Sequence, residues 1–308
     1  MRRSRMADFS KVVCIAILFM CAGRSNAVET LAKIRDTQTV RIGYREASLP
    51  FSYLDQNNKP VGYAIDLCLR VVDGLRRELK LKGVNVVYLP VTSANRFSAL
   101  NENKVDLECG STTNNAERRK IVAFTIPHFV ATVRMVVKSD SRIANWADLQ
   151  GKKVVTTKGT TTVQLMNDRD KVRSLGLVLI EGRDHAESFG KVENGEADAF
   201  PMDDVLLFGL RANAKSPNGF LIVGDSLSAE PYAIAMRKDD PNFKKAVDRE
   251  MGRLINDGEL NRLYDKWFGQ PIPPKRVNLN MPMGYLLRDT LRFPTDKVGD
   301  GLDEVVSK

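Results

Sequence analysis

The pattern of apolar and polar residues changes its period several times between residues 40 and 109. Short apolar runs predict strands, and a stretch with apolar residues near helical spacing predicts a long helix. In chain order the predicted elements are a strand over 40–44, a helix over 63–81, a strand over 84–91, a short helix over 96–103 and a strand that ends at Cys109. This β-α-β-α-β order is typical of an open sheet with helices on its faces, which binds ligands at the carboxyl ends of its strands.

The same order starts again after a strand predicted over 132–138, which would connect two halves of the protein. A short helix, a turn and a strand follow over 146–157, and a Gly-Thr-Thr-Thr turn over 159–162 opens another helix. A strand over 198–204 ends in two carboxylates, and a strand over 231–237 would cross back. The pattern therefore predicts an α/β protein of two lobes, each an open sheet flanked by helices, joined by two crossing strands.

The last part of the chain is predicted to be helical and then irregular. Asp240 is a good cap and Pro241 fits the first helical position, so a helix begins there. A second helix begins after Gly258 and ends at Gly269, and three prolines between residues 271 and 274 break the chain into a tail. We expect a signal peptide over 1–27, a discontinuous lobe 1 over 28–132 and 231–308, and lobe 2 over 133–230.

The first residues combine a basic start, an apolar stretch over 12–23 and small residues on both sides of Asn26. That order predicts a secretory signal peptide that is cleaved after about Ala27. The apolar stretch is shorter than the roughly 20 residues of a membrane-spanning helix. A lipid anchor on Cys21 is the alternative, although Met20 stands where bacterial lipoprotein signals usually have a small residue. The mature chain is expected to be soluble and periplasmic.

The net charge of +9 overstates the basicity of the exported part, because the predicted signal peptide contributes +4. The remaining +5 is scattered among acidic residues, without a basic stripe or interleaved aromatic residues. No nucleic-acid partner is therefore expected.

Two cysteines, Cys68 and Cys109, remain outside the predicted signal peptide. They form an even pair in an oxidising compartment, which allows a disulfide. Because the sequence does not show the geometry that a bridge requires, two buried free thiols are the alternative. His128 and His185 are the two histidines, and no Cys/His cluster has metal-ligand spacing. No metal and no cofactor are expected.

The most informative motif runs from Glu108 through Gly110 to Arg118. A strand ends at Gly110, and the polar residues over 111–114 are predicted to cap a short helix that carries Arg118. Unpaired N–H groups at a helix start, hydroxyl donors and a planar guanidinium together suit a small carboxylate. The alternative interpretation is an ordinary helix cap beside a solvated arginine.

Several strings resemble the extracytoplasmic amino-acid-binding proteins of ABC transporters, solute-binding protein family 3, over nearly the whole mature chain. The matching strings lie at 41–46, 61–67, 110–113, 117–118 and 266–268. The resemblance is closest to the periplasmic glutamate/aspartate-binding members, through strings at 45–48, 92–96, 108–115, 184–185, 202–204 and 211–212. It implies the type II periplasmic binding protein fold, an inner-membrane ABC permease as partner and a monomer.

The resemblance also implies three groups of ligand-binding residues. The α-carboxylate would be held by Arg118, helped by Thr113 and by Thr160 and Thr161 of the other lobe. The ammonium would be held by Asp203, with Ser111 as a further acceptor. The side-chain carboxylate would be held by Arg45, Ser93, Arg96 and His185. Three arginines and a potential imidazolium against one aspartate leave the positive excess that two carboxylates and one ammonium need.

Each of these positions has another interpretation. Arg45 and Arg96 could be surface ion-pair partners, His185 could lie in a loop, and Asp204 could replace Asp203. The three consecutive threonines over 160–162 leave open which hydroxyl faces the ligand.

The chain departs from the family pattern at Cys68 and over 232–234, where related members can have other residues, including a cysteine in the later segment. The departure leaves the disulfide connectivity open. We interpret His128 as structural or exposed and Trp267 as core packing.

The implied function is capture of L-glutamate or L-aspartate between the lobes, closure about the hinge and delivery to the permease. One alternative is an exported enzyme similar to the periplasmic cyclohexadienyl (arogenate/prephenate) dehydratases. Glu46, Glu187 and His185 are conceivable acids but form no recognisable acid/base pair, so no enzyme is expected. Another alternative is a ligand-sensing module on a membrane receptor. The choice between glutamate and aspartate, and binding of amides or other dicarboxylates, stays open.

Overall fold

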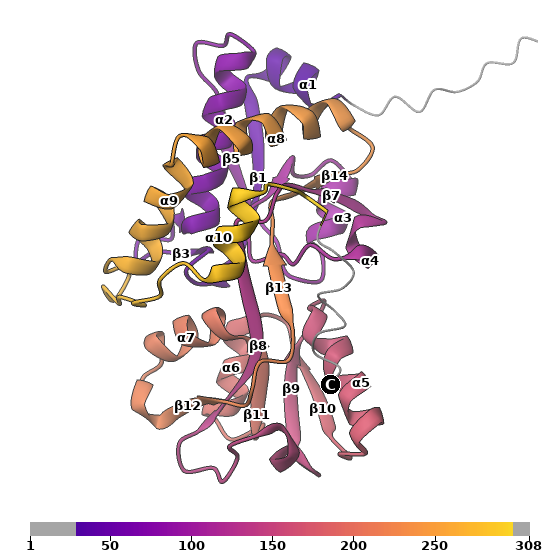
Figure 1. Ribbon diagram of the computed structural model, residues 1–308, viewed down its shortest axis with the longest axis vertical. Coiled ribbons are helices and arrows are strands. Elements are labelled where there is room, and N and C mark those ends of the chain that lie inside the picture. Colours follow the sequence, from indigo (N-terminus) through magenta and orange to yellow (C-terminus); the bar gives the residue numbers. More distant parts are fainter. Residues whose placement is uncertain (1–28, 298–308) are drawn as a thin grey trace, which may run out of the picture.

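The computed structural model describes residues 29–297, which form two lobes joined by two long strands (Figure 1). The predicted signal peptide over 1–27 lies outside the described residues. No helix within 29–297 combines the length and the apolar character needed to cross a bilayer.

The first lobe is built on a five-stranded sheet. Its strands are β1 (Thr39–Tyr44), β5 (Asn85–Pro90), β6 (Leu107–Glu108), β7 (Val122–Phe124) and β14 (Ala235–Arg237), and its helices are α1 (Thr30–Thr37), α2 (Tyr63–Glu78), α3 (Arg96–Asn101), α4 (Ala116–Arg119), α8 (Pro241–Asn256) and α9 (Glu259–Tyr264). The strand order is β5-β1-β6-β14-β7, with β1, β5 and β6 parallel. A small sheet precedes α2 and consists of β2 (Ala47–Ser48), β3 (Ser52–Leu54) and β4 (Pro60–Val61).

The second lobe repeats the arrangement with its own sheet. Its strands are β8 (Phe129–Lys138), β9 (Lys153–Thr157), β10 (Val178–Gly182), β11 (Ala199–Asp203) and β12 (Phe220–Val223), and its helices are η1 (Trp146–Leu149), α5 (Thr161–Arg173), α6 (His185–Glu193), α7 (Asp204–Asn213) and η2 (Pro217–Gly219). The order is β10-β9-β11-β8-β12, with β9, β10 and β11 parallel. The predicted α/β fold of two lobes is confirmed.

Two antiparallel strands, β8 and β13 (Ala229–Tyr232), run side by side between the lobes (Figure 1). The crossing strand predicted over 231–237 is instead two strands, β13 and β14. The chain changes partners between them, because β13 pairs with β8 whereas β14 pairs with β6 and β7. Both predicted lobe boundaries fall inside this crossing region, and their exact positions stay predictions.

Aromatic side chains pack at the junction between the lobes. The Phe51 ring lies 4.9 Å from Phe129, 5.0 Å from Tyr232 and 5.6 Å from Phe268, measured between ring centroids. Phe129 and Tyr232 belong to the two crossing strands, so this cluster anchors both strands to the first lobe. Edge-to-face contacts of this kind add to the free energy gained from burying the rings.

A disulfide joins Cys68 of α2 to Cys109, which follows β6. The two Cα atoms lie 6.4 Å apart. The bridge ties the turn at Gly110 to the core helix α2, so it helps to hold the hydroxyl-rich motif in place.

The predicted position of the helix cap before Arg118 was wrong. The cap of α4 is Asn115, whose side chain accepts from the Arg118 amide at 2.9 Å, and not a residue within 111–114. Asn115 satisfies an N–H of the first helical turn, while residues 111–114 continue in an extended path beside Tyr232.

The tail contains a helix that the sequence pattern did not predict. After α9 the chain makes a π-helical turn, η3 (Asp265–Gly269), and the tail then forms α10 (Tyr285–Arg292). Leu287 of α10 is buried, and the Lys275 ammonium donates to two carbonyls at the end of α7 in the second lobe. The tail therefore touches both lobes.

Candidate ligand-binding site

The carboxyl ends of the parallel strands in the two lobes face each other, and one cavity lies between them. The predicted residues that line it are Ser93, Arg96, Ser111, Thr113, Arg118, Thr160, Thr161, His185 and Asp203, together with the unpredicted Met202. Arg45 lies directly behind His185, with its Nη2 atom 3.4 Å from Nε2 of the imidazole. The tertiary structure thus brings all the predicted residues together.

Three buried guanidinium groups dominate the first-lobe side of the cavity. Arg45 follows β1, Arg96 begins α3 and Arg118 lies in α4, and none is more than 9% exposed. The surface interpretation of Arg45 and Arg96 is therefore wrong. Burial, aided by the charge of Arg96, lowers the pKa of Arg45 to about 10 and that of Arg118 to about 9. Both groups still carry a charge at neutral pH and attract anions.

The rings and carbonyls around these groups hold them in place. The Phe97 ring lies under both guanidinium carbons, at 4.9 Å for Arg96 and 5.5 Å for Arg118. Arg118 also donates from Nη1 to the Thr113 carbonyl at 3.0 Å. A fixed planar fork suits bidentate recognition of a carboxylate.

His185 is the first residue of α6, whose cap Asp184 accepts from the Glu187 amide, so the loop interpretation is wrong. The imidazole is 1% exposed, and Nδ1 lies 3.1 Å from the Thr157 hydroxyl. Burial, followed by the charges of Arg45 and Arg96, lowers the pKa of His185 well below its ordinary value. The imidazole is therefore neutral, and the charge count made with an imidazolium is corrected.

Asp203, at the end of β11, provides the negative group of the second lobe and is 2% exposed. Its Oδ2 atom accepts from the Tyr232 hydroxyl, whereas Oδ1 has no partner among residues 29–297. Asp204 points elsewhere, since it accepts from the amide and hydroxyl of Thr132. The cavity is therefore lined by Asp203 and not by Asp204.

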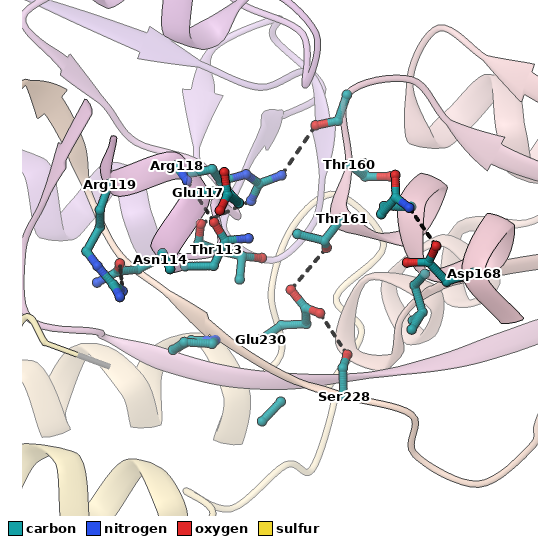
Figure 2. A pocket seen from close by; sticks show the side chains of 17 residues that line it. Thr113, Asn114, Glu117, Arg118, Arg119, Thr160, Thr161, Asp168, Ser228 and Glu230 are labelled. Atoms are coloured by element: carbon teal, nitrogen blue, oxygen red, sulfur yellow. Dashed lines mark hydrogen bonds between the residues drawn. The ribbon is translucent and has the colours of Figure 1, made fainter. Parts of the chain in front are cut away.

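The three consecutive threonines make different contacts, and Figure 2 shows that of Thr161 with Glu230. Thr160 donates its hydroxyl proton to the Thr157 carbonyl at 2.7 Å, and Thr161 donates to Glu230 at 3.0 Å. Thr162 is fully buried and does not line the cavity. Both lining hydroxyls already donate hydrogen bonds to protein groups. The donors that this turn can offer to a ligand are therefore the N–H groups at the start of α5.

Several buried polar atoms around the cavity have no hydrogen-bond partner within the described part of the chain. They are Arg45 Nη1, Ser93 Oγ, Arg96 Nε, Ser111 Oγ and Asp203 Oδ1. Buried polar groups are normally paired, so a cluster of unpaired ones marks a place for a polar ligand. The unpaired hydrogen-bond donors lie on the arginine side of the cavity, and Asp203 provides an unpaired acceptor. An anionic ligand that also carries an ammonium group requires this arrangement.

The lobes touch across the cleft at Gly159. Its carbonyl accepts from Arg118 at 3.3 Å and from Arg96 at 3.4 Å, both in the other lobe. Its φ of +79° is left-handed, and a Cβ there would lie 2.7 Å from the Ser93 carbonyl oxygen. The free space inside the cavity itself is about 10 Å³. A ligand can therefore enter only after the lobes part.

A wider pocket of about 600 Å³ adjoins the cavity and opens outward between α4, α5 and β13 (Figure 2). It shares the residues Thr113, Arg118, Thr160 and Thr161 with the cavity. On its floor, Glu230 of β13 accepts from the hydroxyls of Thr161 and Ser228. This pocket is the mouth of the cleft.

Sequence reasoning missed three buried groups near the site: Glu108, Glu230 and Tyr232. Glu108 is fully buried on β6, and neither carboxylate oxygen has a hydrogen-bond partner within residues 29–297. A Cβ on Gly110 would lie 2.4 Å from that carboxylate and 2.9 Å from Cγ of Arg45, so the three residues are packed together. Glu108 could have been found from its place inside the Gly110 motif. Tyr232 could have been found because it lies in the segment over 232–234 that departs from the family pattern.

The described residues contain no cluster of His, Cys, Asp and Glu side chains that could hold a metal ion. Two α/β lobes facing each other across a cleft lined by charged groups from both define the type II periplasmic binding protein class. Residues 40–270 match the bacterial extracellular solute-binding proteins, family 3, and the chain belongs to that family.

Named relatives agree with this assignment. The chain is 43% identical over 94% of its length, and 97% of the relative's, to the L-glutamate/L-aspartate-binding protein of Pseudomonas aeruginosa. It is 41% identical over 88% of its length, and 90% of the relative's, to the glutamate/aspartate import solute-binding protein of Escherichia coli. Among solved structures it is similar to an ancestral amino acid-binding protein, a precursor of cyclohexadienyl dehydratase, with 30% identity, a TM-score of 0.66 and coverage of 77% of this chain and 99% of that one.

Proposed function

We propose that this protein captures L-glutamate or L-aspartate between its lobes and delivers the amino acid to an ABC permease in the inner membrane. The observation that carries the proposal is the arrangement of charge around the cavity, where buried Arg96 and Arg118 of one lobe face buried Asp203 of the other. A third buried arginine, Arg45, lies behind His185. An acidic amino acid offers two carboxylates and one ammonium, which match those groups. The names of the relatives support the same ligands.

Each group of lining residues has its own role in this proposal. Arg118, Thr113 and the start of α5 at Thr160 and Thr161 bind the α-carboxylate. Asp203 binds the ammonium, with Ser111 as the second acceptor. The side-chain carboxylate lies at Arg45, Ser93, Arg96 and His185, where the neutral imidazole provides a positioning contact and no charge.

Closure follows from the contacts that need both lobes. Arg118 of the first lobe and the α5 start of the second hold the same carboxylate, so binding is complete only when the lobes meet. Gly159 then docks beside Ser93, as the contact distances show. The closed form is the one that the permease receives.

We further propose that residues 1–27 direct export, that cleavage follows about Ala27, and that the mature protein works as a periplasmic monomer. The Escherichia coli relative is named as an import solute-binding protein, which supports this location.

The dehydratase alternative is not favoured. Glu46 and Glu187, two of the acids considered for it, are exposed and do not line the cavity. His185 lines it but is a neutral imidazole engaged with Arg45 and Thr157. A sensing role uses the same pocket, and a pull-down with membrane proteins separates it from transport.

The test is a calorimetric titration of the mature protein, refolded to remove carried-over ligand, with L-glutamate, L-aspartate, L-glutamine and L-arginine. One-to-one binding of the two acidic amino acids, much tighter than of the other two, is the expected result. Absence of binding to all four amino acids would overturn the proposal and favour the dehydratase alternative.

A further inference from the structure

We propose that Tyr232, on the crossing strand β13, is a positioning residue that orients Asp203 for the ligand ammonium, and that Glu230 on the same strand acts on Asp203 in the opposite sense. This inference rests on the proposed binding of an acidic amino acid. It gives the hinge strand a part in ligand recognition, besides its part in joining the lobes.

The Tyr232 side chain is held firmly. Its ring is 0% exposed and lies against Phe51 at 5.0 Å and Phe129 at 5.9 Å between centroids. Its backbone pairs with Phe129 of β8, and its carbonyl accepts from the His128 amide at 2.8 Å. The same residue forms an isolated bridge with Thr113, which lines the cavity. A phenol fixed in this way has one direction in which to donate its proton.

That direction leads to Asp203, a residue of the second lobe. The Tyr232 hydroxyl donates to Oδ2, and Oδ1 has no partner in residues 29–297. Asp203 itself lines the cavity. A carboxylate with one oxygen bonded to a rigid phenol cannot turn freely. The acceptor oxygen is therefore oriented before the ligand ammonium binds, which reduces the loss of side-chain entropy on binding.

Glu230 lies two residues before Tyr232 on β13, so the two side chains project from the same face of the strand. Glu230 accepts a hydrogen bond from Thr161, which lines the same cavity as Asp203. Its oxygens accept from Thr161 at 3.0 Å and from Ser228 at 2.7 Å, and it is 5% exposed (Figure 2). The buried Glu230 charge disfavours ionisation of Asp203, whereas the Tyr232 hydrogen bond favours it. Two residues of one strand thus oppose each other at the ammonium site.

The other groups that face Asp203 come from both lobes, and the balance between them sets its ionisation. The pKa of Asp203 lies well above its ordinary value, mainly because of burial and next because of the Glu230 charge, with a smaller effect of the Asp204 charge. The Tyr232 hydrogen bond and the Arg118 charge act to lower this pKa. Arg96 acts with Arg118, and His185 is neutral.

The expected pH dependence follows from the sign of each effect. The ammonium needs ionised Asp203, so affinity falls as the pH drops through the pKa of Asp203. Tyr232→Phe removes the favourable hydrogen bond, raises that pKa and moves the loss of affinity to higher pH. Glu230→Gln removes the repulsive charge, lowers that pKa and moves the loss to lower pH.

The experiment measures the dissociation constant of L-glutamate by calorimetry between about pH 4 and pH 9 for the mature protein and both variants. We expect Tyr232→Phe to bind about 10-fold more weakly at neutral pH, as for loss of a hydrogen bond to a charged group. Its midpoint should move up and that of Glu230→Gln should move down. Titration of the ligand carboxylates is common to all three proteins and cancels in the comparison.

A thermal unfolding transition shows that each variant is folded, and if Tyr232→Phe does not fold, the downward shift in Glu230→Gln still tests the inference. Equal midpoints in all folded proteins would overturn it while leaving the proposed function in place. Failure of the unmodified protein to bind glutamate would instead overturn the proposed function, and this inference with it.

Discussion

At the scale of single residues, the site depends on charged side chains that are almost completely buried. Arg45 and Arg96 are each 2% exposed, as is Asp203. A buried charge without a partner is costly, so each of these groups favours a ligand that supplies the opposite charge. The charge of the ligand is thereby selected more strongly than its length.

Arg96→Ala tests the assignment of the side-chain carboxylate. We expect glutamate and aspartate to bind roughly 100-fold more weakly, because truncating one partner of a buried charge pair costs several kcal/mol. Binding of glutamine, whose side chain is neutral, should change far less. Calorimetric titration with all three ligands measures the difference.

The matched control is Arg96→Lys, which keeps the charge but loses the planar fork. It should fall between the wild type and Arg96→Ala for the acidic ligands. An equal loss for glutamate and glutamine in Arg96→Ala would contradict the assignment.

At the scale of the element, the turn between β9 and α5 connects chemistry with closure. Gly159 in this turn has a left-handed φ, and its carbonyl receives the guanidinium groups of Arg96 and Arg118. The helix start two residues later presents its N–H groups to the cavity. One short segment therefore contacts the opposite lobe and, in the proposed function, also binds the ligand carboxylate.

Gly159→Ala is expected to weaken glutamate binding by about 10-fold or more, because the added Cβ would lie 2.7 Å from the Ser93 carbonyl oxygen and the Ala94 Cα atom. The lobes could not approach fully. Calorimetry measures the affinity, and small-angle X-ray scattering with saturating ligand should show a larger radius of gyration than for the wild type.

Gly151→Ala is the control for backbone strain. Its φ of +68° is also left-handed, but a Cβ there would meet nothing within 4 Å. Both variants should lose about 1 kcal/mol of stability through the backbone. If the two variants lose affinity equally, close approach at Gly159 is not the cause.

At the scale of the whole molecule, both lobes meet at β8 and β13, the aromatic cluster around Phe51 and the tail. The Cys68–Cys109 disulfide lies in the first lobe and secures the turn that carries Ser111 and Thr113. Stability of that lobe and readiness of the binding site are therefore linked.

The double variant Cys68→Ser/Cys109→Ser should lower the free energy of unfolding by roughly 2–4 kcal/mol, since the bridge spans a loop of 41 residues. Denaturant unfolding measures the change, and glutamate affinity should fall by a smaller factor because the cavity residues keep their other contacts. A reducing agent should shift the wild type to the same midpoint and leave the variant unchanged. An unchanged midpoint in both would show that the bridge contributes nothing.

The sequence by itself determined most of the order of elements and the candidate residues that the structure brings together around one cavity. The change of hydrophobic period predicts each strand and helix locally, and Arg45, Ser93 and Ser111 follow predicted strand ends, which in a parallel sheet share one edge. The motif over 108–118 then indicated Arg118 as a carboxylate-binding group, and the resemblance implied the ligand atoms that Arg118 and Asp203 would bind. The cap at Asn115 and the helix in the tail could not be predicted, because packing and local hydrogen bonds decided them.

Only the tertiary structure decided the protonation and orientation of the site groups. The pKa of His185 is lowered, and its imidazole is neutral, because burial and then the charge of Arg45, 140 residues away, oppose protonation. The hydroxyl of Tyr232, 29 residues further along the chain, donates a hydrogen bond to Asp203, and the Thr161 hydroxyl donates one to Glu230. These properties depend on which distant groups meet in a medium of low dielectric constant, where each charge and hydrogen bond acts strongly. Local sequence patterns do not show which distant groups come into contact in the folded protein.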